Sequence, residues 1–130
     1  MTIVLACLLI AVLIPYVLAG IGGYHKGKQF GKPDNNNPRA QSAQLTGAGA
    51  RAVAAQQNAW EALALFTAAV VATSVAGVPP ASIATPALVF VAARIAHAIC
   101  YLNDLASARS SVFLVGAAMC LWIFVKALAA

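Results

Sequence analysis

The sequence predicts an all-α membrane protein, built as a bundle of four transmembrane helices. Of its 130 residues, 62% are hydrophobic and 8% are charged, whereas a soluble domain carries about 25% charged residues. The apolar residues fall into four runs, each close to the roughly 20 residues that cross the hydrocarbon core as a helix. The length fits a single transmembrane domain over residues 1–130.

The first run, residues 2–24, contains no charged residue. A cleaved signal peptide would begin with Lys or Arg and would have an apolar core of about 7–15 residues. We therefore expect a retained transmembrane helix with Pro15 as a kink. Residues 25–50 follow as a long polar segment, which Gly, Pro and the run Asn35-Asn36-Asn37 mark as a loop.

The other three helices are expected at residues 51–76, 81–102 and 109–129. A tight turn, Gly77-Val78-Pro79-Pro80, separates the second helix from the third, and a short polar linker separates the third from the fourth. Alanine is frequent in the second helix, and small residues permit close approach of membrane helices.

Most of the positive charge lies at one end of this predicted bundle. Seven of the eight basic residues lie in or near the first and third connections, and Lys126 is the exception. The positive-inside rule therefore predicts that both connections, including loop 25–50, are cytoplasmic and that both termini lie outside. The Ala-rich chain, without organelle signals, favours a bacterial inner membrane. The basic residues are not interleaved with aromatic ones, so nucleic acid is not an expected partner.

The three cysteines, Cys7, Cys100 and Cys120, stand in apolar stretches. Their odd number and wide spacing do not indicate a disulfide framework, and we expect packing roles. No second His or Cys stands at ligand spacing from His97, so no metal site is expected.

Polar residues inside the apolar runs mark the candidate site, because a charge at the bilayer centre costs about 2.5–3.5 kcal/mol on insertion scales. On the second helix, Arg51, Asn58 and Glu61 fall within an arc of roughly 80°. Glu61 lies about 15 Å along the helix from Arg51. These three residues predict a polar stripe on one helix face.

The third helix carries a matching stripe, because Arg94, His97 and Tyr101 fall within an arc of roughly 60°. If the two stripes face each other or a neighbouring subunit, Glu61 can pair with an arginine in a pocket that is positive overall. Several structural alternatives stay open. Glu61 and Arg94 could be a purely structural pair, and Asn58 could bond helix to helix. His97 could be a satisfied buried side chain, and Tyr101 and Arg109 could be interfacial anchors.

Two segments resemble the MAPEG superfamily, the membrane-associated proteins in eicosanoid and glutathione metabolism. The stretch from Arg51 to Phe66, with Asn58 and Glu61 three residues apart, is similar to the second-helix signature of the family. The stretch Ala93–Tyr101, followed by Arg109-Ser110, resembles its third helix and the start of its fourth, and Asn37-Pro38-Arg39 also fits. Together these motifs cover nearly the whole chain.

This resemblance implies a homotrimer that binds glutathione between adjacent subunits near the cytosolic face. It implies glutathione-binding roles for a set of six residues, Arg51, Asn58, Glu61, Arg94, His97 and Tyr101. It makes Arg109 the catalytic residue that stabilises the thiolate. A basic residue at the end of the first helix, Lys26 or Lys28, is also expected to help. The chain departs from many relatives at the position four residues before the Asn, which is Ala54 instead of arginine.

The leading hypothesis is a glutathione-dependent transferase or peroxidase that acts on hydrophobic electrophiles or lipid hydroperoxides. Glutathione has two carboxylates and one amine, which matches arginine forks and one acid. The family also has a member that binds and presents a lipid without chemistry, so a lipid- or ligand-binding protein is the alternative. A small multidrug transporter is the third reading, but its essential Glu would lie in the first helix, which is uncharged here.

Overall fold

The computed structural model describes residues 2–130 and consists of helices. The elements are α1 (Thr2–Phe30), α2 (Pro38–Ala43), α3 (Gly47–Val75), α4 (Ala81–Leu102) and α5 (Ala106–Leu128). Four of them, α1, α3, α4 and α5, are long and apolar enough to cross a membrane. The predicted all-α bundle of four membrane helices is therefore confirmed.

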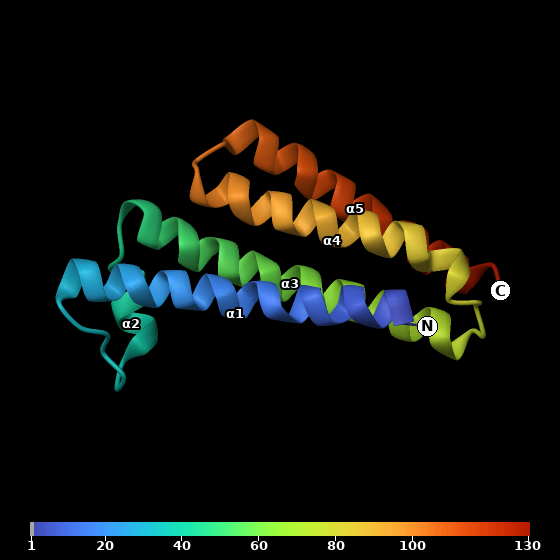
Figure 1. Cartoon of the computed structure of the whole chain (residues 1–130), viewed down its shortest axis with the longest axis horizontal. Coiled ribbons are helices and arrows are strands. Elements are labelled where there is room, and N and C mark those ends of the chain that lie inside the picture. Colours follow the sequence, from blue (N-terminus) through green and yellow to red (C-terminus); the bar gives the residue numbers. More distant parts are fainter. Residues whose placement is uncertain (1) are drawn as a thin grey trace.

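The helices form two pairs, since α1 runs along α3 and α4 runs along α5 (Figure 1). The α4–α5 turn, α2 and the adjoining ends of α1 and α3 lie at one end of the bundle, which we call the loop end. Both chain ends and the α3–α4 turn lie at the opposite end. The first and third connections therefore share one face of the bundle, as the number of spans requires.

The predicted boundaries of the polar loop, residues 25–50, were wrong at both ends. Helix α1 continues to Phe30 because residues 25–30 contain no proline, and it ends where Gly31 adopts a φ of 83°. Within the segment, α2 begins with Pro38 at its first position, where a missing N–H costs nothing. Helix α3 begins at Gly47 rather than at residue 51, and α5 spans 106–128 rather than 109–129.

Two prolines lie inside membrane helices, Pro15 in α1 and Pro86 in α4. Both are buried in the bundle, so the proline rings pack against neighbouring helices rather than lipid. The turn between α3 and α4 depends on Gly77, whose φ of 72° is a conformation that other residues adopt only with strain.

The apolar core lies toward the end of the bundle that carries the termini, and all four membrane helices contribute to it. Phe66 of α3 and Phe90 of α4 stack at its centre with ring centroids 4.2 Å apart. Cys7 and Cys120 are buried in the same cluster, which agrees with their predicted packing role.

Small residues let α3 approach α1 closely near the loop end. The buried face of α3 there is made of Gly49, Ala52, Ala55 and Ala59. A Cβ atom placed on Gly49 would lie 2.9 Å from Cβ of His25. The close approach predicted from the alanine content of this helix is therefore present.

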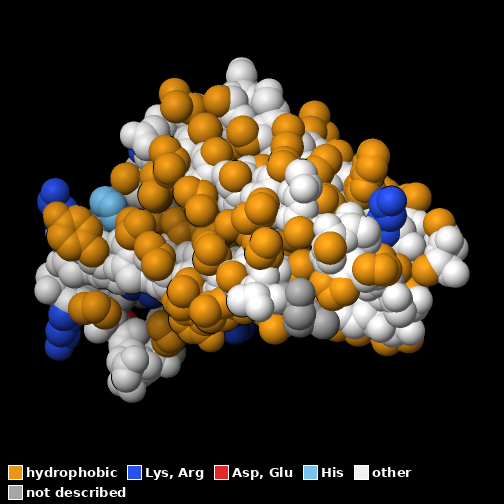
Figure 2. All heavy atoms as spheres, turned by 45° about the vertical axis from the view of Figure 1, so that its right-hand side comes forward, with side chains coloured by type: hydrophobic (Ala, Val, Ile, Leu, Met, Phe, Trp, Pro, Cys, Tyr) orange, Lys and Arg blue, Asp and Glu red, His pale blue; other side chains and the backbone are white. Residues whose placement is uncertain are grey.

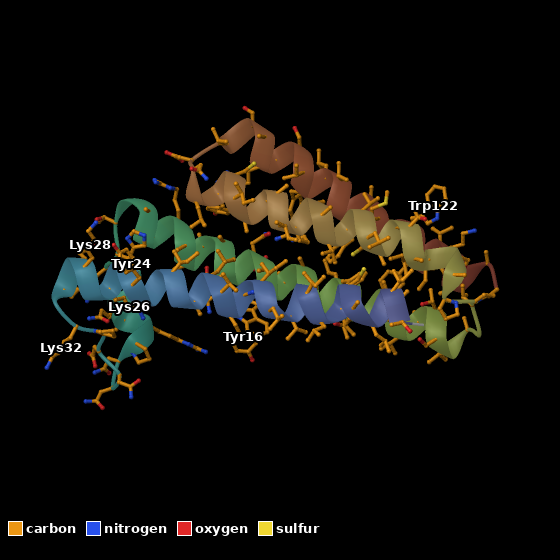
Figure 3. The ribbon with its side chains drawn as sticks, in the orientation of Figure 1. Tyr16, Tyr24, Lys26, Lys28, Lys32 and Trp122 are labelled. Atoms are coloured by element: carbon orange, nitrogen blue, oxygen red, sulfur yellow. The ribbon has the colours of Figure 1, made fainter. Side chains whose placement is uncertain are left out.

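The outer surface has the character of a protein that faces lipid. Hydrophobic side chains cover most of the visible face, and most Lys and Arg side chains in this view gather near the loop end (Figure 2). Tyr24 lies beside Lys28 near the loop end, and Trp122 lies toward the other end (Figure 3). Aromatic residues at both levels are typical of membrane–water interfaces.

Candidate functional site

A buried hydrogen-bond network joins α3 to α4 inside the bundle, and its centre is Arg94. The residue is only 4% exposed. Its NH2 group donates to Oδ1 of Asn58 at 2.5 Å and lies 3.5 Å from the Asn58 carbonyl oxygen. The same NH2 group lies 3.3 Å from Nδ1 of His97, which is also buried. The two predicted polar stripes therefore meet within one subunit.

An apolar cavity of about 320 Å³ extends from this network along α5. Its polar lining comes from Asn58, Glu61 and Arg94. The rest of the lining is dominated by apolar side chains, among them Leu65, Phe90, Phe113, Cys120, Leu121 and Phe124. Gly116 lies on the same wall, where a Cβ would be 3.6 Å from Cδ of Arg94. The cavity has the lining expected for a hydrophobic molecule with one polar end.

A second cavity of about 330 Å³ lies between α4 and the start of α5, and we call it the cationic cavity. Its polar lining is formed by Asn58, His97, Tyr101, Arg109 and Ser110. Cζ of Arg109 lies 4.4 Å from the centroid of the Tyr101 ring, which is the geometry of a cation–π contact. Asn58 and Phe113 line both cavities, so the two are neighbours.

Glu61 lines the apolar cavity but forms no ion pair with Arg94 within the subunit, as the one ion pair among residues 2–130 joins Arg51 to Asp104. Its side chain is on the exposed surface of the single bundle. It lies on α3 inside the membrane-spanning segment. A carboxylate there is costly unless a partner covers it.

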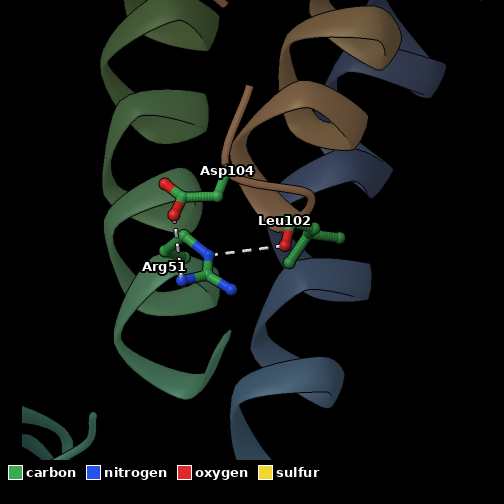
Figure 4. Close-up of polar contacts among 3 residues, drawn as sticks. All are labelled: Arg51, Leu102 and Asp104. Carbon is green, nitrogen blue, oxygen red and sulfur yellow. Dashed lines mark hydrogen bonds and ion pairs between the residues drawn. The ribbon is translucent and has the colours of Figure 1, made fainter. Parts of the chain in front are cut away.

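Arg51 is separated from the other predicted site residues. Its NH1 lies 3.7 Å from Oδ2 of Asp104, and its Nε donates to the carbonyl oxygen of Leu102 at 3.4 Å (Figure 4). Arg51 thus contacts the α4–α5 turn in this subunit and lines neither the apolar nor the cationic cavity.

A third cavity, of about 650 Å³, lies between α1, α2, α3 and the segment that links α1 to α2. Lys26, Arg39, Gln56, Gln57 and Trp60 are among its lining residues, and we call it the loop cavity. Nζ of Lys26 donates to the carbonyl oxygen of Pro38 at 2.8 Å, which ties α1 to α2.

The wall of the loop cavity is ordered by Asp34. The backbone N–H groups of Asn37 and Asn36 donate to Oδ1 of Asp34 at 3.1 and 2.9 Å. These bonds hold the pKa of the Asp34 carboxyl below its usual range. A folded segment therefore stands where the sequence predicted an irregular loop.

Sequence reasoning missed the apolar lining on α5. These residues, Phe113, Gly116, Ala117, Cys120, Leu121 and Phe124, recur at helical spacing. A membrane helix is apolar on every side, so such a stripe has no polar contrast that would reveal it. No group of three or more His, Cys, Asp or Glu within residues 2–130 is placed to hold a metal ion.

The chain matches the model of the MAPEG family over residues 3–129. Comparison with the curated proteins and with the solved structures gives no significant match. The family match covers almost the entire chain and includes every residue of the Arg94 network and of both neighbouring cavities. The protein is an integral, multi-pass membrane protein, and it belongs to the MAPEG family.

Proposed function

We propose that the protein is a membrane-bound, glutathione-dependent transferase or peroxidase that acts on hydrophobic electrophiles or lipid hydroperoxides. The observation that carries the proposal is the contact between two cavities of opposite character. The cationic cavity has Arg109 on its wall, the apolar cavity accommodates hydrophobic groups, and Asn58 and Phe113 line both. A thiol bound in the first would lie beside a hydrophobic substrate bound in the second.

Arg109 is the proposed catalytic residue. A free thiol has a pKa of about 8.5, and a nearby guanidinium lowers it toward neutrality, which raises the fraction of the nucleophilic thiolate. Tyr101 holds the guanidinium by its ring face, so the charge stays at the cavity wall. Fixed placement of a cation beside a developing anion is among the strongest catalytic effects available to a protein.

Two reactions are open to such a thiolate. In conjugation, the sulfur forms a bond to carbon of the electrophile, and the leaving group departs with the electron pair of its bond. In peroxide reduction, the sulfur attacks one peroxide oxygen, the O–O bond breaks, and the second oxygen takes a proton as the alcohol. A second glutathione then converts the sulfenic acid to the disulfide and water.

Glu61 supports the proposal that the active form is a homotrimer with glutathione between subunits. Its carboxylate is exposed on the single bundle within a membrane-spanning helix. Contact with a neighbouring copy would remove it from lipid and place it beside a ligand amine. Asn58, His97 and Tyr101 would then form the rest of the site, with Arg94 bonded behind Asn58 and His97 and with Lys26 and Arg51 at the loop end.

The loop end is proposed to face the cytoplasm of a bacterial cell, with the protein in the inner membrane. Lys26, Lys28, Lys32 and Arg39 all belong to the segments gathered at this end. The positive-inside rule places such a cluster on the cytoplasmic side, where a glutathione pool would reach the cationic cavity.

Isothermal titration of the detergent-purified protein with glutathione, combined with thiolate absorbance near 240 nm, tests the proposal. Saturable binding with a thiolate signal at neutral pH is the expected result. No binding at millimolar glutathione would overturn it. Binding without thiolate would overturn the role of Arg109 and favour a carrier.

The second candidate is a lipid- or ligand-binding protein without chemistry. Ala54 favours it, because many relatives carry an arginine at this position, and the apolar cavity could hold a lipid chain without any reaction. Co-purified lipid that fills the cavity, together with an absence of glutathione binding, would support this candidate.

A further inference from the structure

Arg94 has one chemical property that constrains its partners. A guanidinium group has five N–H donors and no acceptor. Every hydrogen bond that it makes must therefore end on an acceptor atom of the partner. Its NH2 group contacts the side chains of Asn58 and His97.

The first constraint falls on Asn58. Its side chain has one acceptor end and one donor end, and the acceptor Oδ1 receives the bond from Arg94. The amide nitrogen Nδ2 therefore points away from Arg94. Asn58 is half-buried and lines both the apolar and the cationic cavity, so its two N–H donors are available there.

The second constraint falls on His97. Its Nδ1 faces Arg94 and must carry the lone pair, so the proton of the neutral ring lies on Nε2. His97 is 3% exposed, and its Nε2 has no hydrogen-bond partner among residues 2–130. No fully buried side-chain nitrogen or oxygen in that part of the chain lacks a partner. Nε2 is therefore accessible, and the cationic cavity is the one that His97 lines.

We propose that Arg94 is a positioning residue that locks Asn58 and His97 as hydrogen-bond donors toward the bound ligand, and does not itself bind that ligand. The buried cation directs two neutral side chains so that each presents N–H groups to the cavities. His97 in this state is a fixed donor from Nε2, and Nδ1 is unavailable as a general base because Arg94 occupies it.

We call the fixed orientation of Asn58 and His97 as hydrogen-bond donors the donor lock, and it defines the chemistry of the ligand. Asn58 Nδ2, His97 Nε2 and the Arg109 guanidinium all offer hydrogen to the cationic cavity, and no carboxylate lines that cavity within residues 2–130. An anionic acceptor, such as a carboxylate or a thiolate, satisfies all three donors. The identification of this acceptor with glutathione rests on the proposed function, whereas the donor lock itself does not.

Nitrogen-15 NMR of the imidazole rings tests the lock without any ligand. The chain has two histidines, so the His25→Gln variant leaves His97 as the only signal. We expect His97 with a protonated Nε2 and an unprotonated Nδ1 at neutral pH. A protonated Nδ1, or a mixture of both tautomers, would overturn the proposal. In His25→Gln/Arg94→Leu the two tautomers should mix, and in His25→Gln/Arg94→Lys, which keeps a donor, the Nε2 form should persist.

Ligand affinity tests the role of the two donors. His97→Phe removes the Nε2 donor and should weaken glutathione binding by about tenfold, the effect of one hydrogen bond to a charged group. His97→Gln keeps an N–H donor and should stay within about threefold of the native protein. Native affinity in His97→Phe would overturn the donor role. If the unaltered protein binds no glutathione, the proposed function fails, and the tautomer measurement still decides whether Arg94 locks His97.

Discussion

Arg51 at the start of α3 and Asp104 in the α4–α5 turn form an ion pair, with 3.7 Å between NH1 and Oδ2. Because Arg51 also bonds the carbonyl oxygen of Leu102, one side chain joins the two helix pairs at the loop end. The sequence places Arg51 on the same stripe as Asn58 and Glu61, yet in the structure Arg51 bonds the α4–α5 turn. Its release from Asp104 would leave an unpaired cation at the loop end.

The Asp104→Asn variant is expected to release Arg51 with little loss of stability. The Asp104 side chain is 72% exposed, so the pair should contribute no more than about 1 kcal/mol. Thermal unfolding in detergent should therefore show a small change. Asp104→Gly is the informative comparison, because Asp104 has a φ of 59°. Glycine adopts that conformation without strain and should regain about 1 kcal/mol. A large loss of thermal stability in Asp104→Asn would mean that the ion pair is a main source of stability for the turn.

The close contact of α1 with α3 predicts that Gly49→Ala destabilises the protein. The added Cβ would lie 2.9 Å from Cβ of His25 and 3.0 Å from Cδ2 of Leu45, so one helix must shift. We expect the free energy of unfolding to fall by about 1–3 kcal/mol, the usual effect of overpacking. Gly27→Ala is the matched control, because its Cβ would meet nothing within 4 Å. Equal stability of the two variants would contradict the observed packing.

Gly116 offers a way to fill the apolar cavity without touching the cationic one. Gly116→Leu should place a side chain in the 320 Å³ space and lower turnover with a large apolar electrophile by about tenfold or more. Gly116→Ala should leave turnover nearly unchanged, since its Cβ would lie in ordinary van der Waals contact, 3.6 Å from Cδ of Arg94. Glutathione affinity, measured by titration, should be native in both variants. Unchanged turnover in Gly116→Leu would exclude this cavity as the substrate site.

Arg109→Leu should separate binding of the thiol from its activation. With the cation removed, the bound thiol should stay protonated at neutral pH, and the absorbance near 240 nm should disappear. Turnover should fall by about 10²–10³-fold, as for loss of one group that stabilises a reacting anion, while glutathione affinity changes little. Arg109→Lys, which keeps the charge, should recover part of the thiolate signal. A native rate in Arg109→Leu would remove this residue from the mechanism.

Asp34 predicts a pH dependence confined to the segment between α1 and α2. Its pKa is lowered by the N–H groups of Asn37 and Asn36, so the stabilisation is complete above the ordinary pKa of about 3.9. It is lost as the pH falls through the lower, folded-state pKa. Limited proteolysis by an acid protease should therefore cut this segment more rapidly at the lowest pH. Asp34→Asn should show the faster cutting at all pH values, and an identical pattern in both proteins would contradict the role of the carboxylate.

The sequence was sufficient for the bundle and for two polar stripes that need partners, because a charged residue within an apolar run demands one. It paired Arg94 with Glu61, whereas within the subunit Arg94 bonds Asn58. The period of the helix was enough to place those partners on facing stripes. The contact of Arg51 with Asp104 could not be predicted, because no helical period reports that Asp104 would come within reach from another connection.

The polar loop was misjudged for a different reason. Gly31 and Pro38 do interrupt the helices there, but residues 25–30 before them and residues 47–50 after them are compatible with helix and extend α1 and α3. The apolar cavity could not be foreseen, since its volume depends on how Gly116 and Phe124 meet α3 across the bundle.

The bond between Arg94 and Asn58 also has a consequence for biogenesis. A helix that carries a central arginine into the bilayer alone meets a cost of about 2.5–3.5 kcal/mol. Asn58 lies on α3, which precedes α4 in the chain and therefore leaves the ribosome first. The acceptor for Arg94 is thus already synthesised when α4 emerges. Arg94 can therefore meet its acceptor on the first helix pair as soon as α4 enters the bilayer.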